Sequence, residues 1–340
     1  MSEEFSTEGL GFRAFKLPST QNLQHLVEGT PPMPLHQSSG RWRIGLSLAL
    51  VTATLWGVLP IALKVVLQAV DVYTVTWFRF LVSFGLLGLF LAARGQLPTW
   101  GQMRKAKLSL LAIAILFLAL NYGLFLHGLD QTSPTNSQVI LQLAPVFFGM
   151  GALVVFKERY THRQWLGLAI LVLGLTLFFD AQISNLLSAP APYLLGSGLL
   201  VLSAIAWAVY ALAQKQILTV LSSGQIMWII YGGGMLLFSP AAAPAQLVSL
   251  TPLQWFMLLF SALNTLLAYG AFAEALDHWD ASRVSAVLSI TPIMTLASVF
   301  AVSQLLPSLL LPEPITAMSV AGAMLVVVGS LAIALGQQSS

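Results

Sequence analysis

Apolar residues follow one another in long runs after residue 40, and short polar turns separate the runs. Ten of these runs hold about 20 residues, which is the length that a helix needs to cross the hydrocarbon core of a membrane. None of them alternates with the period of two that is typical of a barrel strand. We therefore predict an all-α integral membrane protein with ten transmembrane helices. The predicted spans are 44–67, 72–93, 108–128, 134–156, 161–179, 194–218, 222–240, 252–276, 283–304 and 315–335.

The second half of the chain repeats the first with small insertions. Matching residues are offset by 151 around the first span, by 147 around the third and fourth, and by 155 around the fifth. The matched pairs include Trp56 with Trp207, Lys64 with Lys215, Tyr122 with Tyr269, Pro145 with Pro292 and Gly167 with Gly322. Because five is an odd number, the second unit must enter the membrane upside down. We predict two inverted five-helix repeats, 41–180 and 181–340, that meet around a mid-membrane cavity.

The composition agrees with a membrane protein. Hydrophobic residues make up 57% of the chain and charged residues 8%, with a mean hydropathy of +0.83. Polar groups this scarce could not cover a water-facing surface. The net charge of +3 does not indicate a nucleic-acid partner, because the basic residues lie in short loops between apolar runs. The chain has no cysteine, which excludes disulfides and thiolate chemistry.

The loops predict the orientation in the membrane. With a cytoplasmic amino terminus, the basic loops of the first half all lie inside. The inner loops hold Arg41, Arg43, Arg94, Arg104, Lys105, Lys107, Lys157, Arg159 and Arg163, and the outer loops hold Asp71, Asp130 and Asp180. We expect a multi-pass protein of the plasma (cell inner) membrane with both termini in the cytoplasm. Residues 1–40 are acidic and lack an apolar run, so we expect a disordered cytoplasmic tail without a signal or transit peptide.

Prolines interrupt three of the predicted spans, at Pro60, Pro145 and Pro292. Each proline removes a backbone donor and frees the carbonyl four residues earlier, which must then find water, a side chain or a substrate. The freed carbonyls belong to Trp56, Leu141 and Leu288. The alternative is a kink that serves helix shape alone.

Polar residues accompany two of these prolines. Gln138 and Gln142 share a helix face with Pro145, and their counterparts in the second repeat are Ser285 and Ser289. Glutamines that face lipid would be costly, so this face is predicted to look inward. It either lines a hydrated substrate cavity, which we favour, or forms hydrogen bonds between helices.

Trp56 and Trp207 lie at the centres of the first and sixth spans, too deep for the aromatic belts at the membrane interfaces. Together with Tyr210, one turn beyond Trp207, they could stack on an aromatic, cationic or amphiphilic substrate. Packing against neighbouring helices is the alternative.

Arg79 has no basic counterpart, because Ile230 occupies its position in the second repeat. An unpaired guanidinium inside a span is costly. Arg79 is therefore predicted either to bind an anionic group of the substrate or to be neutralised by Asp71 or by freed carbonyls.

Three further charged residues are candidates for the transport cycle. Glu274 lies near the inner end of the eighth span. It could bind and release protons during transport, or its carboxylate could extend to the inner membrane interface. Lys64 and Lys215 are repeat counterparts and are predicted at the outer and inner mouths of the cavity. As gating residues they would close the two mouths in turn, and otherwise both extend to the nearest interface.

Other signals are structural. Thr161 and Gln164 predict a helix cap before the fifth span, with Glu158 beside it, and Glu313 with Thr316 predicts a weaker one before the tenth. Glycines recur on one face of both spans and predict a close helix approach outside the cavity. They are Gly167, Gly174, Gly322 and Gly329.

No motif of a hydrolase, nucleotide-binding enzyme or metal site is present, so we expect no enzyme, cofactor or metal.

The order of these motifs resembles the EamA-type transporters of the drug/metabolite transporter (DMT) superfamily. The resemblance rests on Leu55-Trp56-Gly57-x-x-Pro60-x-x-x-Lys64, Arg79, Leu129-Asp130, Ala144-Pro145 and Lys157-Glu158-Arg159, and it covers residues 44–335 as two five-span units. The second unit departs from the family pattern at Ala208, Ile230 and Pro314.

The resemblance implies transport of a small organic metabolite, often by export, driven by a coupling ion or by exchange. An amino acid or similar metabolite is our first expectation for the substrate, and a cationic amphiphilic drug is the second. An intramembrane enzyme or a scaffold without transport is the alternative from another class. The expected partners are the substrate, the lipid bilayer and a coupling ion, either proton or sodium, and a homodimer is left open.

Overall fold

The computed structural model describes residues 38–157, 160–187, 191–305 and 316–335, and every regular element within them is helical. The helices are α2 (Trp42–Val66), α3 (Val72–Ala93), α4 (Trp100–Lys105), α5 (Leu108–Gln131), α6 (Pro134–Leu141), α7 (Leu143–Val155), α8 (His162–Leu187), α9 (Ala191–Ile217), α10 (Ser223–Phe238), the 3-10 helix η1 (Pro244–Ser249), α11 (Pro252–His278), α12 (Ala281–Leu288), α13 (Thr291–Leu305) and α14 (Ala317–Leu335). The predicted all-α class is confirmed. The predicted tail up to residue 37 lies outside the described residues, as do Glu158, Glu313 and Pro314.

Seven helical segments of the described chain are long and apolar enough to cross a membrane. They are α2, α3, α5, α6 with α7, α9, α11, and α12 with α13. The three remaining predicted spans correspond to shorter apolar helical stretches, namely residues 162–177 of α8, all of α10, and residues 320–333 of α14. The chain is therefore a multi-pass membrane protein.

The polar turns start the helices by capping them. Asp71 accepts hydrogen bonds from the backbone N–H groups of Tyr73 and Thr74 at the start of α3. Before α8, the backbone N–H of Thr161 donates to Gln164 Oε1, and the N–H of Gln164 donates back to Thr161 Oγ1. The predicted cap at Thr161 is thus confirmed.

Two predicted spans are broken near their middle. The fourth span divides into α6 and α7 at Gln142, and the ninth divides into α12 and α13 at Ser289 and Ile290. Each break comes three residues before a proline, Pro145 or Pro292, whose ring clashes with the carbonyl of the preceding turn. The predicted interruption is confirmed at Pro145 and Pro292, whereas α2 continues through Pro60 without a break.

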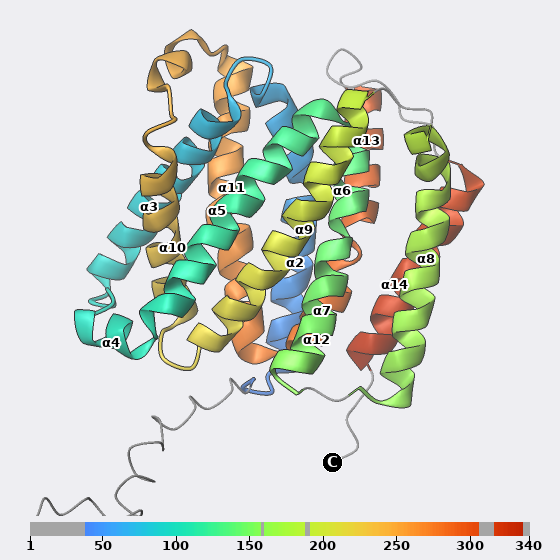
Figure 1. Ribbon diagram of the computed structural model, residues 1–340, viewed down its shortest axis with the longest axis horizontal. Helices are drawn as coiled ribbons and strands as arrows, with labels where there is room; N and C mark the ends of the chain where they lie inside the picture. The colour runs from blue at the N-terminus through green and yellow to red at the C-terminus, as the bar shows by residue number, and fades with distance from the viewer. Residues whose placement is uncertain (1–37, 158–159, 188–190, 306–315, 336–340) are drawn as a thin grey trace, which may run out of the picture. The chain divides into compact units, whose positions relative to one another are not determined.

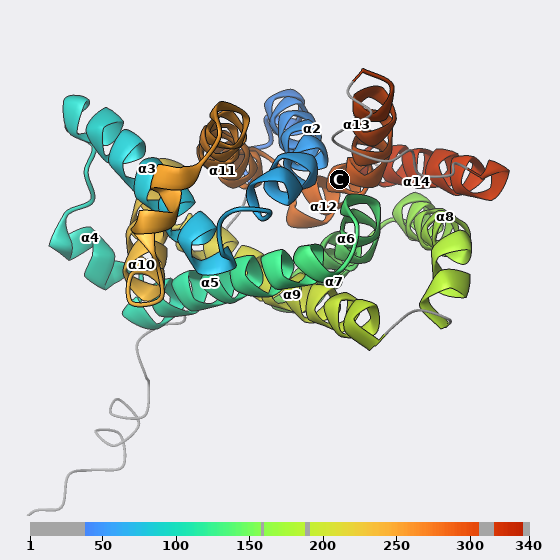
Figure 2. The ribbon, with the colours of Figure 1, turned by 90° about the horizontal axis from the view of Figure 1, so that it is seen from above.

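The helices pack in matched pairs. α2 packs against α11, and its counterpart α9 packs against α5, the counterpart of α11. α3 packs on α10 and α8 packs on α14, so these counterparts contact each other directly. Figures 1 and 2 show the α3–α10 pair at one side of the bundle and the α8–α14 pair at the other.

Counterpart hydroxyls hold the two central pairs together. Thr52 Oγ1 on α2 donates to the carbonyl of Ala268 on α11 at 3.2 Å. Ser203 Oγ on α9 donates to the carbonyl of Asn121 on α5, also at 3.2 Å. Thr52 and Ser203 occupy the same place in the two repeats, and so do Ala268 and Asn121. In both cases, therefore, the same type of hydroxyl-to-carbonyl hydrogen bond joins the first long helix of one half to the third of the other.

Glycines bring α8 and α14 close together. A Cβ atom on Gly167 would lie 2.9 Å from the carbonyl oxygen of Gly329, and one on Gly329 would lie 2.7 Å from that of Gly167. On Gly174 it would lie 2.6 Å from the backbone nitrogen of Val326. No larger side chain fits without moving backbone, so the predicted helix approach is confirmed.

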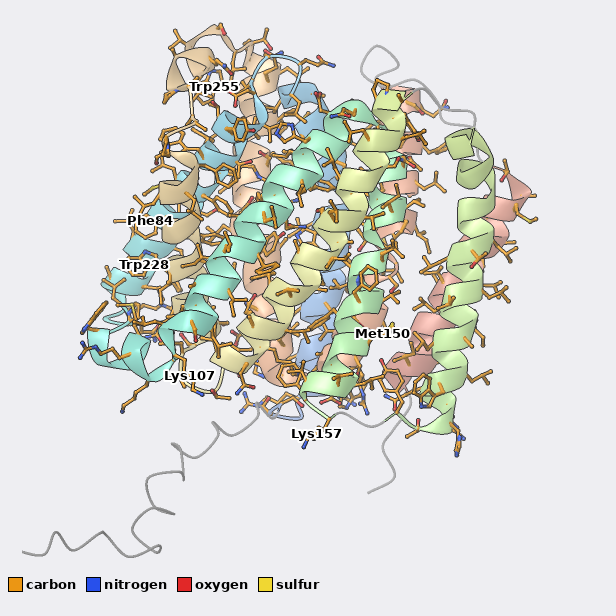
Figure 3. All side chains as sticks on the ribbon, in the orientation of Figure 1. Phe84, Lys107, Met150, Lys157, Trp228 and Trp255 are labelled. Carbon is orange, nitrogen blue, oxygen red and sulfur yellow. The ribbon has the colours of Figure 1, made fainter. Side chains whose placement is uncertain are left out.

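The outer surface of the bundle is apolar. Leu89, Val154 and Phe256 are each more than half exposed and lie on different helices. Figure 3 shows the charged Lys107 and Lys157 at one end of the bundle and Trp255, a residue type typical of membrane interfaces, at the other. An apolar side surface between polar ends is the pattern that a lipid bilayer requires.

Candidate functional site

A cavity lies where the two broken spans meet the central helices. Its lining residues are Trp56, Leu59, Arg79, Asn121, Tyr122, Phe125, Gln138, Leu141, Gln142, Ala144, Pro145, Trp207, Tyr269, Leu288 and Thr291. Five of the eight residues that we predicted to bind substrate line this cavity: Trp56, Arg79, Gln138, Gln142 and Trp207. No described residue of α8 or α14 lines it.

Aromatic rings form one wall of the cavity. Trp56 and Trp207 meet edge to face, with ring centroids 5.6 Å apart and an interplanar angle of 84°. The ring of Tyr269 lies 5.0 Å from that of Trp56, and Phe272 lies behind both indoles. The two tryptophans therefore pack against each other, as the packing alternative predicted, and they also border the cavity.

Arg79 is only 2% exposed, and its partners are on α11. Its Nε donates to Thr265 Oγ1 at 2.9 Å and to the carbonyl of Ser261 at 3.3 Å. The guanidinium carbon lies 4.6 Å from the centroid of the Tyr122 ring. No carboxylate of a described residue lies within 4.0 Å of it. Asp71 caps α3 instead, so the alternative in which Asp71 neutralises Arg79 does not occur.

The amide side chains of α6 compensate for the proline in α2. Gln138 Nε2 donates to the carbonyl of Trp56 at 3.2 Å, which is the carbonyl that Pro60 leaves without a helical partner. In the second repeat the hydroxyl of Thr291 donates to the freed carbonyl of Leu288 at 2.6 Å. The predicted need of these carbonyls for a new donor is met by side chains in both cases.

Two polar atoms of the cavity lining have no hydrogen-bond partner among the described residues. They are the Oε1 of Gln142 and the hydroxyl of Tyr122, which lies near the side chains of Thr265 and Tyr269 without a hydrogen bond shorter than 3.5 Å. Both side chains are at least 97% buried. Leaving a buried polar group unpaired costs roughly 1–3 kcal/mol, so each atom is available for a ligand or a water.

Three residues that we predicted at the substrate site lie elsewhere. Tyr210 is fully buried behind Trp207, and its hydroxyl faces the sulfur of Met227 at 3.6 Å. Ser285 and Ser289 bond to carbonyls of their own helix and border a smaller pocket against α7 and α8. The helix-face argument placed them opposite the glutamines, but the second broken span turns that face away from the cavity.

The two predicted gating lysines bind helix ends. Lys64 Nζ donates to the carbonyls of Leu129, Asp130 and Thr132 at 2.8–3.0 Å, at the end of α5. Lys215 Nζ, which is 2% exposed, lies 3.5 Å from the carbonyl of Trp279, the counterpart of Thr132, at the end of α11. A cation at a helix carboxyl end is favourable because it meets the negative end of the dipole.

Glu274 lies at the end of α11, away from the cavity lining. The hydroxyl of Ser223 donates to its Oε2, and its Oε1 lies 3.5 Å from His278 Nε2. Asp277 completes a group whose ligand atoms all lie within 4.8 Å, which is a spacing that a cation could use. Ser39 approaches the same group, with its hydroxyl 2.8 Å from His278 Nδ1.

Sequence reasoning missed four polar lining residues. Asn121 donates to the hydroxyl and carbonyl of Ser203 at 2.8 and 3.1 Å. Tyr122 and Tyr269 are repeat counterparts with rings 5.7 Å apart. Thr291 sits directly after the second break. Their signal was available, because a polar residue in mid-span and a duplicated tyrosine both mark an inward face.

The sequence profile of the EamA-like transporter family matches residues 43–179 and 194–335, which together cover most of the chain. The chain belongs to the EamA-like transporter family. This confirms the resemblance to the drug/metabolite transporter superfamily. The match falls on both halves of the molecule, so each half by itself carries the family pattern.

Several curated proteins are similar over nearly their whole length. A protein of Escherichia coli K12 named "Uncharacterized inner membrane transporter YhbE" is 36% identical over 87% of this chain and 92% of its own. An "Uncharacterized transporter" of Haemophilus influenzae is 34% identical over 87% and 96%. A "Probable amino-acid metabolite efflux pump" of Salmonella typhimurium is 24% identical over 83% and 92%. The chain is thus a membrane transporter of this family.

A solved crystal structure has the same fold. It superposes with a TM-score of 0.65 over 85% of this chain and 95% of its own, at 14% sequence identity. At that identity the similarity concerns the helix arrangement alone.

Proposed function

We propose that this EamA-family transporter is a secondary transporter that exports a small organic metabolite, such as an amino acid or a similar compound, by alternating access. One observation carries the proposal. The cavity lies where two helices, one from each half, are broken at counterpart positions. Broken helices at mid-membrane are typical of transporter substrate sites, because the interrupted backbone leaves polar groups toward the cavity. The "efflux pump" name of one relative supports the direction.

We also propose that ten spans form two inverted repeats, 41–180 and 181–340, with both termini inside. Exchanging the halves maps every pair of packed helices described above onto another packed pair. The link with α4 and the link with η1 follow counterpart helices and lie at opposite ends of the bundle (Figure 1). A parallel repeat would put both links at the same end.

Cysteine labelling tests this topology, since the native chain has none. Lys105 in the first link and Ser249 in the second are both exposed, whereas the adjacent Ala106 is fully buried and unsuitable. Lys105→Cys is expected to react with an impermeant reagent only from the cytoplasm, and Ser249→Cys only from outside. Labelling of both from one side contradicts the inverted arrangement.

Flux measurements test the function itself. Inverted membrane vesicles with an imposed proton or sodium gradient should accumulate a labelled metabolite if the chain exports it. Trp56→Ala and Gln142→Leu change the cavity and should reduce accumulation at normal protein abundance. Trp100→Ala and Gln68→Leu are matched controls on exposed residues and should leave it unchanged. Equal flux in all four variants contradicts a transport path through this cavity.

The gates are proposed at Lys64 and Lys215, because each lysine ties its own helix to the end of another. Lys64→Ala is expected to favour outward opening and Lys215→Ala inward opening. Accessibility of Ser289→Cys, which is buried in this structure, reports the change from each face. A shift in the same direction, or no shift, leaves both lysines as helix-end caps.

Glu274 is the proposed coupling residue, and Glu274→Gln should then uncouple flux from the gradient.

Export of a cationic amphiphile is the second candidate. The aromatic wall of Trp56, Trp207 and Tyr269 favours it, because indole and phenol rings attract cations. The charge of Arg79 at the same cavity opposes it.

A further inference from the structure

The formal charge of the cavity comes from one residue. Among the described residues that line it, Arg79 is the only one that carries a charge, and no lining residue is acidic. A guanidinium has five N–H groups, and here the Nε is the nitrogen that hydrogen-bonds a described residue. The two terminal nitrogens are left for whatever fills the cavity. A charge buried without a counter-ion is expensive, so an anion that enters the cavity gains a partner that the protein does not supply.

The broken helices do not alter this balance. The first turns of α7 and α13 reach the cavity through Ala144 and Thr291, and helix amino ends attract anions. The last turns of α6 and α12 reach it through Leu141 and Leu288, and helix carboxyl ends attract cations. Each break is only one or two residues wide, so the opposite ends nearly offset each other. The full charge of Arg79 therefore makes the electrostatic potential in the cavity positive.

The unpartnered atoms of the cavity fit the same ligand. The hydroxyl of Tyr122 belongs to the ring on which the Arg79 guanidinium lies, and it has a proton to donate. A carboxylate offers several lone pairs and can accept from a guanidinium and a hydroxyl together. Gln142 Oε1 can accept from a neutral donor on the ligand, such as an amide N–H or a hydroxyl.

The rest of the cavity is apolar. Trp56, Trp207, Leu59 and Phe125 offer an aromatic and aliphatic wall for the body of the ligand. An ammonium group would find no carboxylate on this wall and would be repelled by Arg79 through a medium of low dielectric constant. The carboxylate of a zwitterion can pair with Arg79, whereas its ammonium finds no carboxylate in the cavity lining and is repelled by Arg79.

We infer that the cavity binds net-anionic organic acids with an apolar body, whose carboxylate pairs with Arg79 and whose body lies against Trp56 and Trp207. The inference rests on the proposed function in taking this cavity as the substrate site. Within the metabolites of that proposal, it selects acids whose amine is absent or acylated over free amino acids and over amines.

Four probes with one phenylpropyl body test the charge preference: 3-phenylpropionate, L-phenylalanine, 3-phenylpropionamide and 3-phenylpropylamine. Binding is measured on the purified full chain in nanodiscs, by thermal unfolding and by quenching of tryptophan fluorescence. The acid is expected to bind at least about tenfold more tightly than the amide, as a charge-assisted bidentate hydrogen bond should give. Phenylalanine should lie between them, and the amine should bind most weakly.

Variants show whether Arg79 is the cause. Arg79→Gln should remove the difference between acid and amide, whereas a structural role would weaken all four probes together. Arg79→Lys keeps the charge but not the fork and should restore part of the preference. Arg94→Gln is the control, because Arg94 is an exposed arginine at the other end of α3. If Arg79→Gln does not fold, Tyr122→Phe keeps the ring and should lower affinity for the acid alone.

Equal affinity for acid and amide, tighter binding of the amine, or no binding of any probe overturns the inference. A preference for the acid that survives in both Arg79→Gln and Tyr122→Phe also overturns it. Flux is scored separately. Selective acid binding without flux of any compound contradicts the proposed transport but not the inference, and gradient-driven flux of the amine alone contradicts the inference but not transport.

Discussion

The two halves of the molecule share a backbone plan but contribute different side chains to the cavity. At four counterpart positions the first half has a strongly polar residue and the second half has a small or apolar one. The pairs are Arg79 with Ile230, Asn121 with Ala268, Gln138 with Ser285 and Gln142 with Ser289. All four residues of the first half line the cavity, and none of their counterparts does.

The hydroxyls of the two central helix pairs and the glycines of the α8–α14 pair follow the opposite rule. Thr52 and Ser203 bond to counterpart carbonyls at the same distance, and the glycines of α8 and α14 contact one another. Close helix packing is required in both halves, so equivalent residues provide it in each. One asymmetric ligand needs each polar group only once, so the polar residues of the cavity can differ between the halves.

The largest effect is expected where the halves are equivalent. Gly174→Leu would place side-chain atoms against the backbone of α14, and Gly329→Leu would place them 2.5 Å from the backbone nitrogen of Leu171. Overpacking without room to relax should cost about 3 kcal/mol or more in each case, and folded protein should be lost. Gly198→Leu, with nothing within 4 Å of its Cβ position, should be tolerated. Yield and thermal unfolding in detergent measure this. A tolerated change at one glycine and loss at the other would break the equivalence.

A middle effect is expected where the halves differ. Gln138→Leu keeps the volume but leaves the carbonyl of Trp56 without its donor, and should lower the free energy of unfolding by about 1–3 kcal/mol. Ser285→Ala removes only a bond to Ser282 in the same helix and should cost less than about 0.5 kcal/mol. Denaturant titration in mixed micelles compares the two. Equal losses would show that the polar residues of both repeats do the same structural work.

The smallest difference separates Thr52 from Ser203. Thr52→Val removes one hydroxyl bonded to Leu48 and Ala268, and should cost about 0.5–1 kcal/mol. Ser203→Ala also removes an acceptor of Asn121, so its cost should be larger, about 1–1.5 kcal/mol. The same titration in mixed micelles resolves the order. A larger loss in Thr52→Val would show that the hydrogen bond from Asn121 to Ser203 does not stabilise the α5–α9 pair.

Much of this arrangement was predictable along the chain. The positions of the apolar helices follow from run length, and the freed carbonyl of Trp56 follows from Pro60, because a missing backbone donor always leaves an acceptor four residues earlier. The approach of α8 and α14 follows from glycines in both repeats. These predictions depend on neighbours in sequence or on duplication, which the sequence displays directly.

The partners of Arg79 were not predictable in this way. Asp71 is closer in sequence, but α11 brings Thr265 and Ser261 to the guanidinium from across the bundle. Ser285 and Ser289 share the helical spacing of the glutamines, yet the second broken span faces them toward α7 and α8. In both cases the sequence limited the choices without deciding among them.

By itself, then, the sequence determined the helical class, the membrane as solvent, the duplication and the carbonyls that the prolines leave without a helical donor, because these depend on local periodicity and on backbone hydrogen bonding. The tertiary structure alone decided which polar groups meet in the cavity. The rotation of each helix about its axis is set by packing against several others at once, and a few tens of degrees of rotation separate a side chain in the cavity from one that faces a neighbouring helix.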